Sequence, residues 1–299
     1  MSALPRGLDH IVHAARDIDA QADFYRRAGF TVGAHNKHSW GTHNRVVQLP
    51  GFFVELLNIG QPELIVPHAP QSFSFGDFAR SFLAHDEGLA MLVLEGKGAV
   101  ADAEAFRRAG IGDFQVFDFE REAKRPDGST VKVAFSLAFA TDEQARDAGF
   151  FTCQQHYPEN FWNSAFQDHP NGVTGIAGVT MVAERPEDHR HFFGAFTGVS
   201  EFKSSSSGIA VVTPRGDIQV MTPSAYRMLV GTKEPDLARG GRLAAIRFVA
   251  SDKAKLLSAL AKGGILAVER NGNVVVPPDV AFGATLVFEP PSQRSREVY

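Results

Sequence analysis

The sequence is poor in cysteine, which excludes disulfides as the means of holding the fold together. Cys153 is the single cysteine among 299 residues, so no disulfide can form within the chain. A chain of this kind is typical of a reducing compartment, and we expect a cytoplasmic location. The opening segment, Met1 to Arg6, also lacks the apolar core of a signal peptide.

Long apolar runs and clusters of like charge are absent too. No stretch of about 18 apolar residues occurs, so we expect no membrane partner. The net charge is −4 and the pI is about 6.3, and no basic stripe indicates a nucleic-acid partner. The sequence contains no GxSxG, P-loop, GxGxxG or HExxH pattern, which removes several catalytic classes.

Phenylalanine, in contrast, is abundant, with 25 Phe against 4 Tyr and 2 Trp. This excess favours either thick sheet cores or an apolar pocket, and composition alone does not separate the two. Hydrophobic residues make up 44% of the chain and charged residues 21%, which is typical of a globular protein with a sizeable core. The length allows two domains of about 150 residues each, or one larger domain.

A repeat runs along the chain, and repeats indicate how a fold is assembled. An offset of 81 residues places Gly88 on Gly7, and both copies then carry the run Arg-Arg-Ala-Gly at the same position. A third copy begins near Gly175, and a weaker fourth copy begins near Leu243. The chain therefore contains four related units.

Each unit has the same internal order. An apolar strand comes first, a helix of about 10 residues ending at glycine follows, and two or three strands separated by turn residues complete it. Because one βαβββ unit has a sheet face to bury, we expect four modules paired into two cup-shaped, mixed-sheet α+β domains. We place an N-terminal domain at residues 1–156, a linker at 157–174 and a C-terminal domain at 175–299. The stretch 60–86 lacks periodicity and is a candidate lid.

Two strands of the first unit each carry one good metal ligand within an apolar run. His10 lies in GLDHIV at residues 7–12, and Glu55 lies in FFVELL at residues 52–57. A buried carboxylate is costly unless it is paired, hydrogen-bonded or bound to a metal. Glu55 therefore needs a partner, and His10 is the candidate if the two strands lie side by side.

In these features the sequence resembles the vicinal oxygen chelate superfamily, which includes glyoxalase I, extradiol dioxygenases and fosfomycin and bleomycin resistance proteins. It is most similar to the glyoxalase-like domain family. The resemblance rests on LDHIV at 8–12, the helix with Asp17, Phe24 and Gly29, HSWGTHN at 38–44, FFVELL at 52–57 and EGLAMLVLE at 87–95. It implies the glyoxalase/dioxygenase-like fold and a divalent metal (Zn, Ni, Mn or Fe), held by the first and last strands of each module.

The resemblance assigns any metal to the first pair of modules, because His10 and Glu55 match the ligands of the first and last strands there. The corresponding positions of the later modules hold other residues: Met91, Cys153 or Gln154, Gly178, and a residue near Val220. The C-terminal half is thus expected to be degenerate, and to support the structure, shape the pocket or form a homodimer contact.

Further candidates lie near the ends of these strands. His38 and His156 would complete a metal set with His10 and Glu55, and His38 and Glu55 are the catalytic candidates. Substrate-binding candidates are Thr42, Asn44, His156 and Trp162. For Thr42 and Asn44 a purely structural role within the turn stays open.

Three functions fit the sequence. The first is a metal-dependent lyase, isomerase or dioxygenase that chelates vicinal oxygens of a small, oxygen-rich molecule. The alternative is a non-catalytic protein of the same fold that binds and sequesters a small molecule in a Phe-rich interior. The third is a metal-free hydrolase or isomerase that uses Glu55 as its base.

Overall fold

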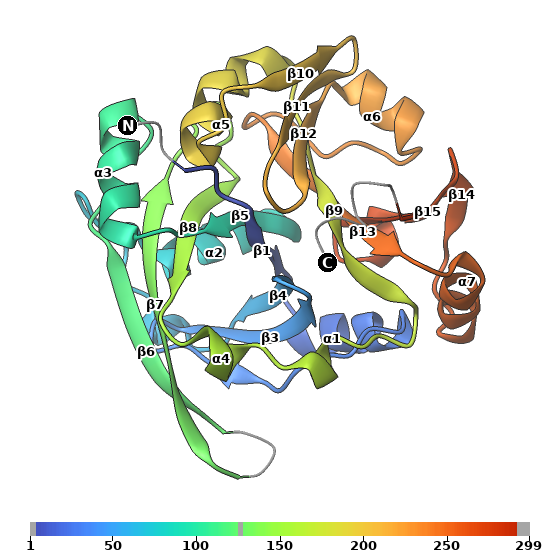
Figure 1. Cartoon of the computed structure of the whole chain (residues 1–299), viewed down its shortest axis with the longest axis horizontal. Helices are drawn as coiled ribbons and strands as arrows, with labels where there is room; N and C mark the ends of the chain where they lie inside the picture. Colours follow the sequence, from blue (N-terminus) through green and yellow to red (C-terminus); the bar gives the residue numbers. More distant parts are fainter. Residues whose placement is uncertain (1–3, 125–127, 292–299) are drawn as a thin grey trace.

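The computed structural model describes residues 4–124 and 128–291, which form two eight-stranded mixed sheets (Figure 1). The strand order is β2-β3-β4-β1-β5-β8-β7-β6 in the first sheet and β10-β11-β12-β9-β13-β16-β15-β14 in the second. The two orders are the same when the second is renumbered from its own first strand, so each sheet is a pair of βαβββ modules. The predicted four-module fold is confirmed.

The first sheet and its helices occupy residues 8–166. Its strands are β1 (Leu8–Ala14), β2 (Asn36–Lys37), β3 (Thr42–Leu49), β4 (Phe52–Ile59), β5 (Gly88–Glu95), β6 (Phe117–Lys124), β7 (Thr130–Ala140) and β8 (Gly149–Gln155). Its helices are α1 (Ile18–Arg27), η1 (Pro62–Leu64), α2 (Phe75–Leu83), α3 (Ala99–Ala109), α4 (Pro158–Phe161) and η2 (Ser164–Phe166). The short helices α4 and η2 lie in the predicted linker, and the predicted domain boundaries stay predictions.

The second sheet repeats the pattern. Its strands are β9 (Val173–Val182), β10 (Phe202–Ser205), β11 (Gly208–Val212), β12 (Asp217–Met221), β13 (Arg242–Ala250), β14 (Val268–Arg270), β15 (Asn273–Val276) and β16 (Thr285–Glu289). Its helices are η3 (Pro186–His189), α5 (Arg190–Thr197), α6 (Pro223–Leu229), α7 (Lys253–Lys262) and η4 (Pro278–Val280).

The pairing of β1 with β5 confirms the repeat at the level of single residues. Ile11 pairs with Leu92, and the neighbouring pairs mirror each other, because His10 pairs with Val93 and Val12 pairs with Met91. An approximate two-fold axis therefore passes through the Ile11–Leu92 pair. It relates each residue of β1 near this pair to the residue of β5 that lies 81 positions later in the sequence.

The same register identifies the true counterpart of Glu55. Val12 pairs with Glu55 on β4, and its counterpart Val93 pairs with Phe151 on β8. Phe151 therefore occupies the position that the sequence alignment gave to Cys153 or Gln154. The sequence alignment placed the counterpart two or three residues too late, because the strands before β8 differ in length from those before β4. Strand pairing gives the correct register.

Apolar side chains form three separate groups. The largest group lies on the outer faces of both sheets and includes residues of α1, α3, α5 and α7. The other two groups lie on the opposite faces, inside the cups of the first and second sheets. The outer layer thus joins the two halves, and each cup keeps its own interior.

Helix α2 covers the first cup, and it lies in the stretch that the sequence left without periodicity. The Ser74 hydroxyl caps the helix by accepting a hydrogen bond from the backbone N–H of Asp77 at 3.1 Å. Phe75 and Phe82 of this helix are buried with the apolar residues of the cup. This part of the stretch therefore packs on the interior of the first cup, and its role as a lid stays a prediction.

The second cup has a buried tyrosine and an ion-pair cluster of its own. Tyr226 of α6 is buried, and its hydroxyl donates to Thr285 Oγ1 at 2.8 Å. Gly178 occupies the position of His10, and a Cβ atom there would lie 2.2 Å from the Arg247 guanidinium. Arg247 is in turn paired with Asp217 and Glu289. An ion-pair cluster thus stands where the first cup has a histidine.

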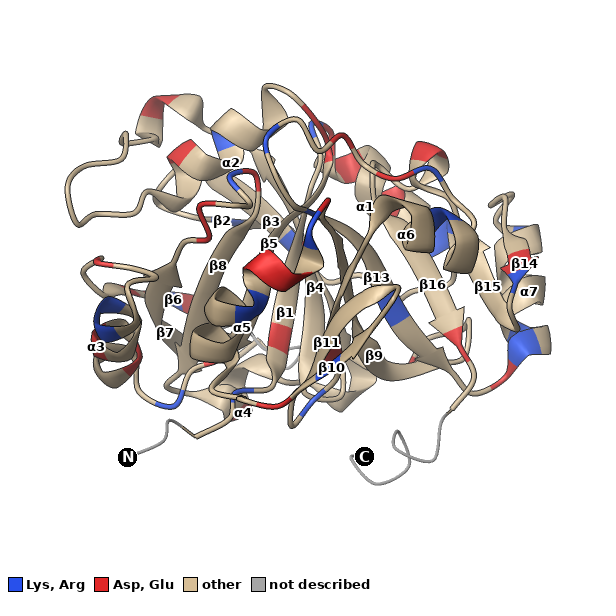
Figure 2. Ribbon diagram, turned by 90° about the horizontal axis from the view of Figure 1, so that it is seen from above, with Lys and Arg blue, Asp and Glu red and all other residues tan. Residues whose placement is uncertain are grey.

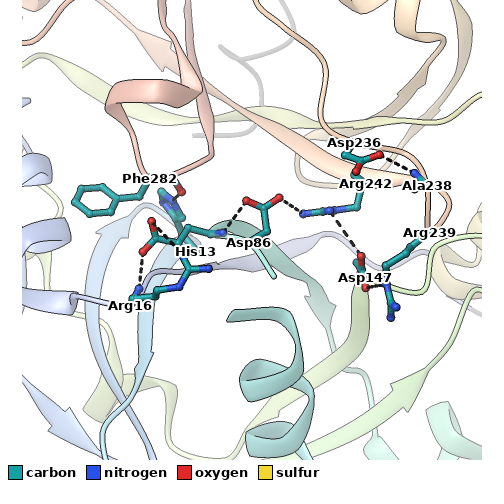
Figure 3. A network of polar contacts seen from close by, with 10 residues as sticks. His13, Arg16, Asp86, Asp147, Asp236, Ala238, Arg239, Arg242 and Phe282 are labelled. Atoms are coloured by element: carbon teal, nitrogen blue, oxygen red, sulfur yellow. Dashed lines mark hydrogen bonds and ion pairs between the residues drawn. The ribbon is translucent and has the colours of Figure 1, made fainter. Parts of the chain in front are cut away.

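Polar contacts close the seam between the halves (Figure 3). His13 is fully buried, and its Nε2 donates to the Phe282 carbonyl at 2.9 Å while its Nδ1 accepts from the Tyr25 hydroxyl at 2.9 Å. Burial lowers the pKa of His13 to about 4, so the ring is neutral. Arg242 bonds Asp86 across the same seam at 3.0 Å.

Charged groups lie on helices, connecting loops and several strands, with both signs interspersed (Figure 2). In the described part of the chain, no helix is long and apolar enough to span a membrane. The absence of a nucleic-acid partner, the homodimer contact and the cytoplasmic location stay predictions.

Candidate active site

The interior of the first cup brings His10 and Glu55 together. Strand β4 lies between β1 and β3, and His10 pairs with Phe53, two residues before Glu55. The two side chains are therefore diagonal neighbours on one face of the sheet. His10 Nε2 lies 3.9 Å from Glu55 Oε2, and both residues are buried, at 4% and 6% exposure. The pairing inferred from the sequence is present, although the two atoms are not in hydrogen-bond contact.

A bulge in β1 gives His10 a second partner. The register of β1 against β5 shifts between Leu8 and His10, so Asp9 is an extra residue and its side chain does not simply alternate with that of its neighbour. His10 Nδ1 donates to Asp9 Oδ1 at 2.6 Å, and Gln155 Nε2 donates to the other Asp9 oxygen at 3.1 Å. This fixes the imidazole and leaves its Nε2 facing Glu55.

Asn44 connects Glu55 to His38. Asn44 Nδ2 donates to Glu55 Oε1 at 2.6 Å and lies 3.2 Å from His38 Nε2. An amide nitrogen only donates, so His38 Nε2 accepts and His38 Nδ1 donates to the Thr42 hydroxyl at 2.8 Å. Asn36 Nδ2 donates to Asn44 Oδ1 at 3.1 Å, which sets the orientation of the amide.

A tight turn makes this network possible. Gly41 has φ +90°, and a Cβ atom there would lie 2.4 Å from the Gln61 carbonyl oxygen, so only glycine fits. The turn folds His38 back over the start of β3, where Thr42 and Asn44 lie. The His38 ring stacks on Trp40, with ring centres 4.4 Å apart.

Burial controls the charge of both titratable groups in this network. It raises the pKa of Glu55 above the usual value, against the opposing effects of His10, the Asn44 hydrogen bond and Arg121. It lowers the pKa of His38 to about 3, with smaller contributions from Arg121 and His43. His38 is thus a neutral ring with both nitrogens engaged, which suits it to hold Asn44 rather than to transfer protons.

These groups line a cavity of about 60 Å³ whose walls are mostly aromatic. Since one water needs roughly 10–15 Å³ of such volume, the space holds about four to six waters. Its apolar lining residues are Trp40, Val46, Phe53, Phe75, Phe119, Phe135, Leu137, Phe151, Cys153 and Phe161. The excess of phenylalanine in the composition is explained in part by this wall.

Arg121 is the one lining residue that sequence reasoning missed and that carries a positive charge. It lies on β6, two residues after Phe119, so both side chains face the cup. The signal was present in the alternation of Phe117, Phe119 and Arg121, where two apolar residues and one charged residue share a strand face. Without the paired sheets, that face could not be recognised as an interior one.

Three predicted site residues lie outside the cavity lining, namely Thr42, His156 and Trp162. Thr42 is fully buried and its hydroxyl bonds His38. His156 is exposed, and its Nε2 donates to Ser136 Oγ at 2.7 Å. Ser136 alternates with the lining residues Phe135 and Leu137, so His156 lies against the opposite face of β7. Trp162 packs behind the wall, with its ring centre 5.9 Å from that of Phe53.

The donor set does not by itself fit a bound metal ion. In the described residues no group of three His, Cys, Asp or Glu side chains is placed to hold one. The second module has Met91 and Phe151 at its ligand positions, Asn44 caps one oxygen of Glu55, and the same amide occupies the Nε2 of His38. Structural and catalytic sites normally supply three or four protein ligands, and here His10 and one oxygen of Glu55 are left.

Comparison with known proteins agrees with this architecture. The family model described as "Glyoxalase-like domain" matches residues 8–196, well over half of the chain. The chain belongs to the glyoxalase-like domain family. It is thereby a member of the vicinal oxygen chelate superfamily, as the sequence predicted. The match includes β1, β4 and the whole cavity, and no curated protein matches the sequence.

Two solved structures share the fold of this glyoxalase-like protein. A hypothetical protein from Staphylococcus aureus has a TM-score of 0.67 at 11% identity, over 96% of this chain and 100% of its own. A mutant of 4-hydroxymandelate synthase from Streptomyces coelicolor has a TM-score of 0.51 at 10% identity, over 99% of this chain and 96% of its own. Both likenesses concern the fold alone.

Proposed function

We propose that this glyoxalase-like protein is an enzyme that moves a proton on a small molecule held in the first cup, with Glu55 as the acid–base group. The observation that carries the proposal is a carboxyl group at 6% exposure in an aromatic cavity, with one oxygen fixed and a raised pKa. A carboxyl shifted toward neutrality can both accept and return a proton near physiological pH.

The two oxygens of Glu55 have different roles in this proposal. Oε1 accepts the Asn44 hydrogen bond, so the carboxyl plane is held still. Oε2 has no hydrogen bond among the described residues and lies on the side of His10, at 3.9 Å from Nε2. Oε2 is therefore the atom that takes the proton from the substrate and gives it back.

His10 and the wall support this chemistry. Asp9 fixes the His10 ring, so that Nε2 is presented at a constant position beside Glu55 and can bond a polar atom of the substrate. The aromatic wall keeps bulk water from the carboxyl, which strengthens each polar contact inside the cavity. The reaction class that these parts serve is proton abstraction next to a carbonyl, as in an isomerase or a lyase.

Metal-dependent catalysis on vicinal oxygens is the second candidate. One observation favours it: the Asp9–His10 hydrogen bond is the arrangement in which a carboxylate orients a metal-ligating imidazole. The two remaining donors are fewer than such a site needs, so we derive no step through a metal. Binding without catalysis, by contrast, would leave the raised pKa of Glu55 without a role.

Solvent exchange tests the proposal. The protein is incubated in D₂O with a panel of small carbonyl compounds, and loss of their C–H signals is followed by NMR. We expect exchange with the wild type and a 10²- to 10⁴-fold slower rate with Glu55→Gln. The glutamine keeps the shape of the side chain and the acceptor for Asn44, and Glu104→Gln on the surface of α3 is the matched control.

The outcomes separate the candidates. Binding of panel members with no exchange would sink the proposal and favour the sequestering function. A stoichiometric metal in protein prepared without chelators, lost in both His10→Ala and Glu55→Ala, would favour the second candidate instead.

A further inference from the structure

Arg121 is a cation in the cavity wall that has no carboxylate partner among the described residues. Burial lowers its pKa, and the charge of Glu55 acts on it in the opposite direction from within the same cavity. Its one hydrogen bond in the described part of the chain is a long one, 3.4 Å, to the carbonyl of its neighbour Glu122. The guanidinium therefore keeps most of its donors for something else.

The three arginines that the described structure buries most deeply are each neutralised by a carboxylate. Arg6 bonds Asp102 at 2.5 Å, Arg242 bonds Asp86 at 3.0 Å, and Arg247 is paired in the second cup. Burying a cation is expensive unless an anion accompanies it, and these three sites meet that requirement within the chain. Arg121 is partly buried, and the carboxylate of Glu55, which acts on it from within the cavity, forms no ion pair with it, so an entering anion would give it a direct partner.

The shape and chemistry of the cavity restrict that anion. Apart from Arg121, the polar lining consists of His10, His38, Asn44 and Glu55, and these already bond or face one another. The remaining wall is apolar, and the volume of about 60 Å³ corresponds to roughly four to six waters. A phosphate ester or a polyol would leave polar groups unpaired against the aromatic rings.

We propose that the substrate is a small monocarboxylate with an apolar body, and that the guanidinium of Arg121 binds its carboxylate. This inference rests on the proposed function for the reaction of the bound carboxylate at Glu55, whereas the binding of the carboxylate by Arg121 is independent of it. Arg121 binds the carboxylate with two parallel N–H donors, the body lies among the phenylalanine rings, and the carbon next to the carboxylate faces Glu55. Arg121 is thus the residue that determines specificity.

Matched probes test the inference. Isobutyrate and its neutral counterpart isobutyramide are titrated into the full-length protein, with binding followed by calorimetry and by tryptophan fluorescence. Trp40 lines the cavity and Trp162 packs on its wall, so both tryptophans of the chain report on it. We expect the wild type to bind isobutyrate at least 10-fold more tightly than isobutyramide.

Two variants assign that preference to Arg121. Arg121→Gln should weaken isobutyrate binding by 10- to 100-fold, the range for a charge-assisted hydrogen bond, and leave isobutyramide binding unchanged. Arg121→Lys should retain part of the preference, and Arg108→Gln on the surface of α3 is the control. Far-UV circular dichroism and thermal melting establish that each variant is folded.

The inference is overturned if the wild type binds no carboxylate at up to about 50 mM, or if Arg121→Gln keeps the full preference. Its failure is distinguishable from that of the proposed function. Carboxylate binding that depends on Arg121, without solvent exchange, would support the binding site and refute the chemistry. Solvent exchange that depends on Glu55, together with equal binding of neutral and anionic compounds, would support the chemistry and refute the carboxylate site at Arg121.

Discussion

Removing the amide of Asn44 should raise the pKa of Glu55 by about one unit. In Asn44→Ala the carboxylate loses the 2.6 Å hydrogen bond that stabilises its charged form. A hydrogen bond to a charged group is worth roughly 1.5–3 kcal/mol, and one pKa unit is about 1.4 kcal/mol. The gross effect is therefore about one to two units, and water entering the vacated space reduces it to the lower end.

The stability of Asn44→Ala should follow with a definite sign. Glu55 has a folded-state pKa above its unfolded-state value, so ionising it opposes folding. The free energy of unfolding is thus greatest below the unfolded pKa and falls as the pH rises toward the folded pKa. In Asn44→Ala this fall should continue to a higher pH than in the wild type.

Carboxyl-labelled glutamate NMR measures the pKa of Glu55 directly, and urea unfolding between pH 4 and 8 measures the stability. Asn271→Ala is the matched control, because Asn271 is exposed in the second half of the chain and does not line the cavity. An unchanged or lowered pKa of Glu55 in Asn44→Ala would refute the reasoning that Asn44 stabilises the charged carboxyl.

Two further predictions concern the scaffold. The pKa of His13 is about 4 in the folded protein and 6.5 in the unfolded chain, so the free energy of unfolding should fall by about 3 kcal/mol as the pH drops from above 6.5 to 4. In urea unfolding, His13→Gln should lose this pH dependence, and an unaltered pH profile in the variant would contradict the prediction. Arg247→Met should lower the unfolding free energy by about 2 kcal/mol, less than for a fully buried pair because Asp217 and Glu289 are about a quarter exposed. Neutralising both carboxylates in the same chain should restore the stability, and isobutyrate binding in the first cup should not change.

The scaffold was largely readable because repetition is a property of the sequence itself. Matching runs such as Arg-Arg-Ala-Gly, at one offset, reveal four modules without any knowledge of contacts. His10 and Glu55 were also identifiable, because each is a polar residue that interrupts an apolar strand. The counterpart of Glu55 was misplaced, since an insertion between strands moves the alignment without altering its local pattern.

The remaining site residues depend on which face of each strand points into the first cup. Asp9 reaches His10 only because of a bulge, which arises from the pairing of β1 with β5. Arg121 is distant from Glu55 in the sequence and joins the cavity because the sheet curls into a cup. His156 looked equivalent to these residues but lies on the other face of its sheet. The face on which a residue lies is set by strand pairing.

The sequence by itself thus determined the modules, their pairing and the strands that hold His10 and Glu55, because hydrophobic periodicity and repetition are local properties. Only the tertiary structure decided that the first cup holds an aromatic cavity, while the second contains Tyr226 of α6 and the Arg247 cluster. It also decided that Glu55 bonds Asn44 and that Glu55 and Arg121 line the same cavity. Charge, burial and distance between remote strands are properties of the packed chain, and they determine the chemistry of this site.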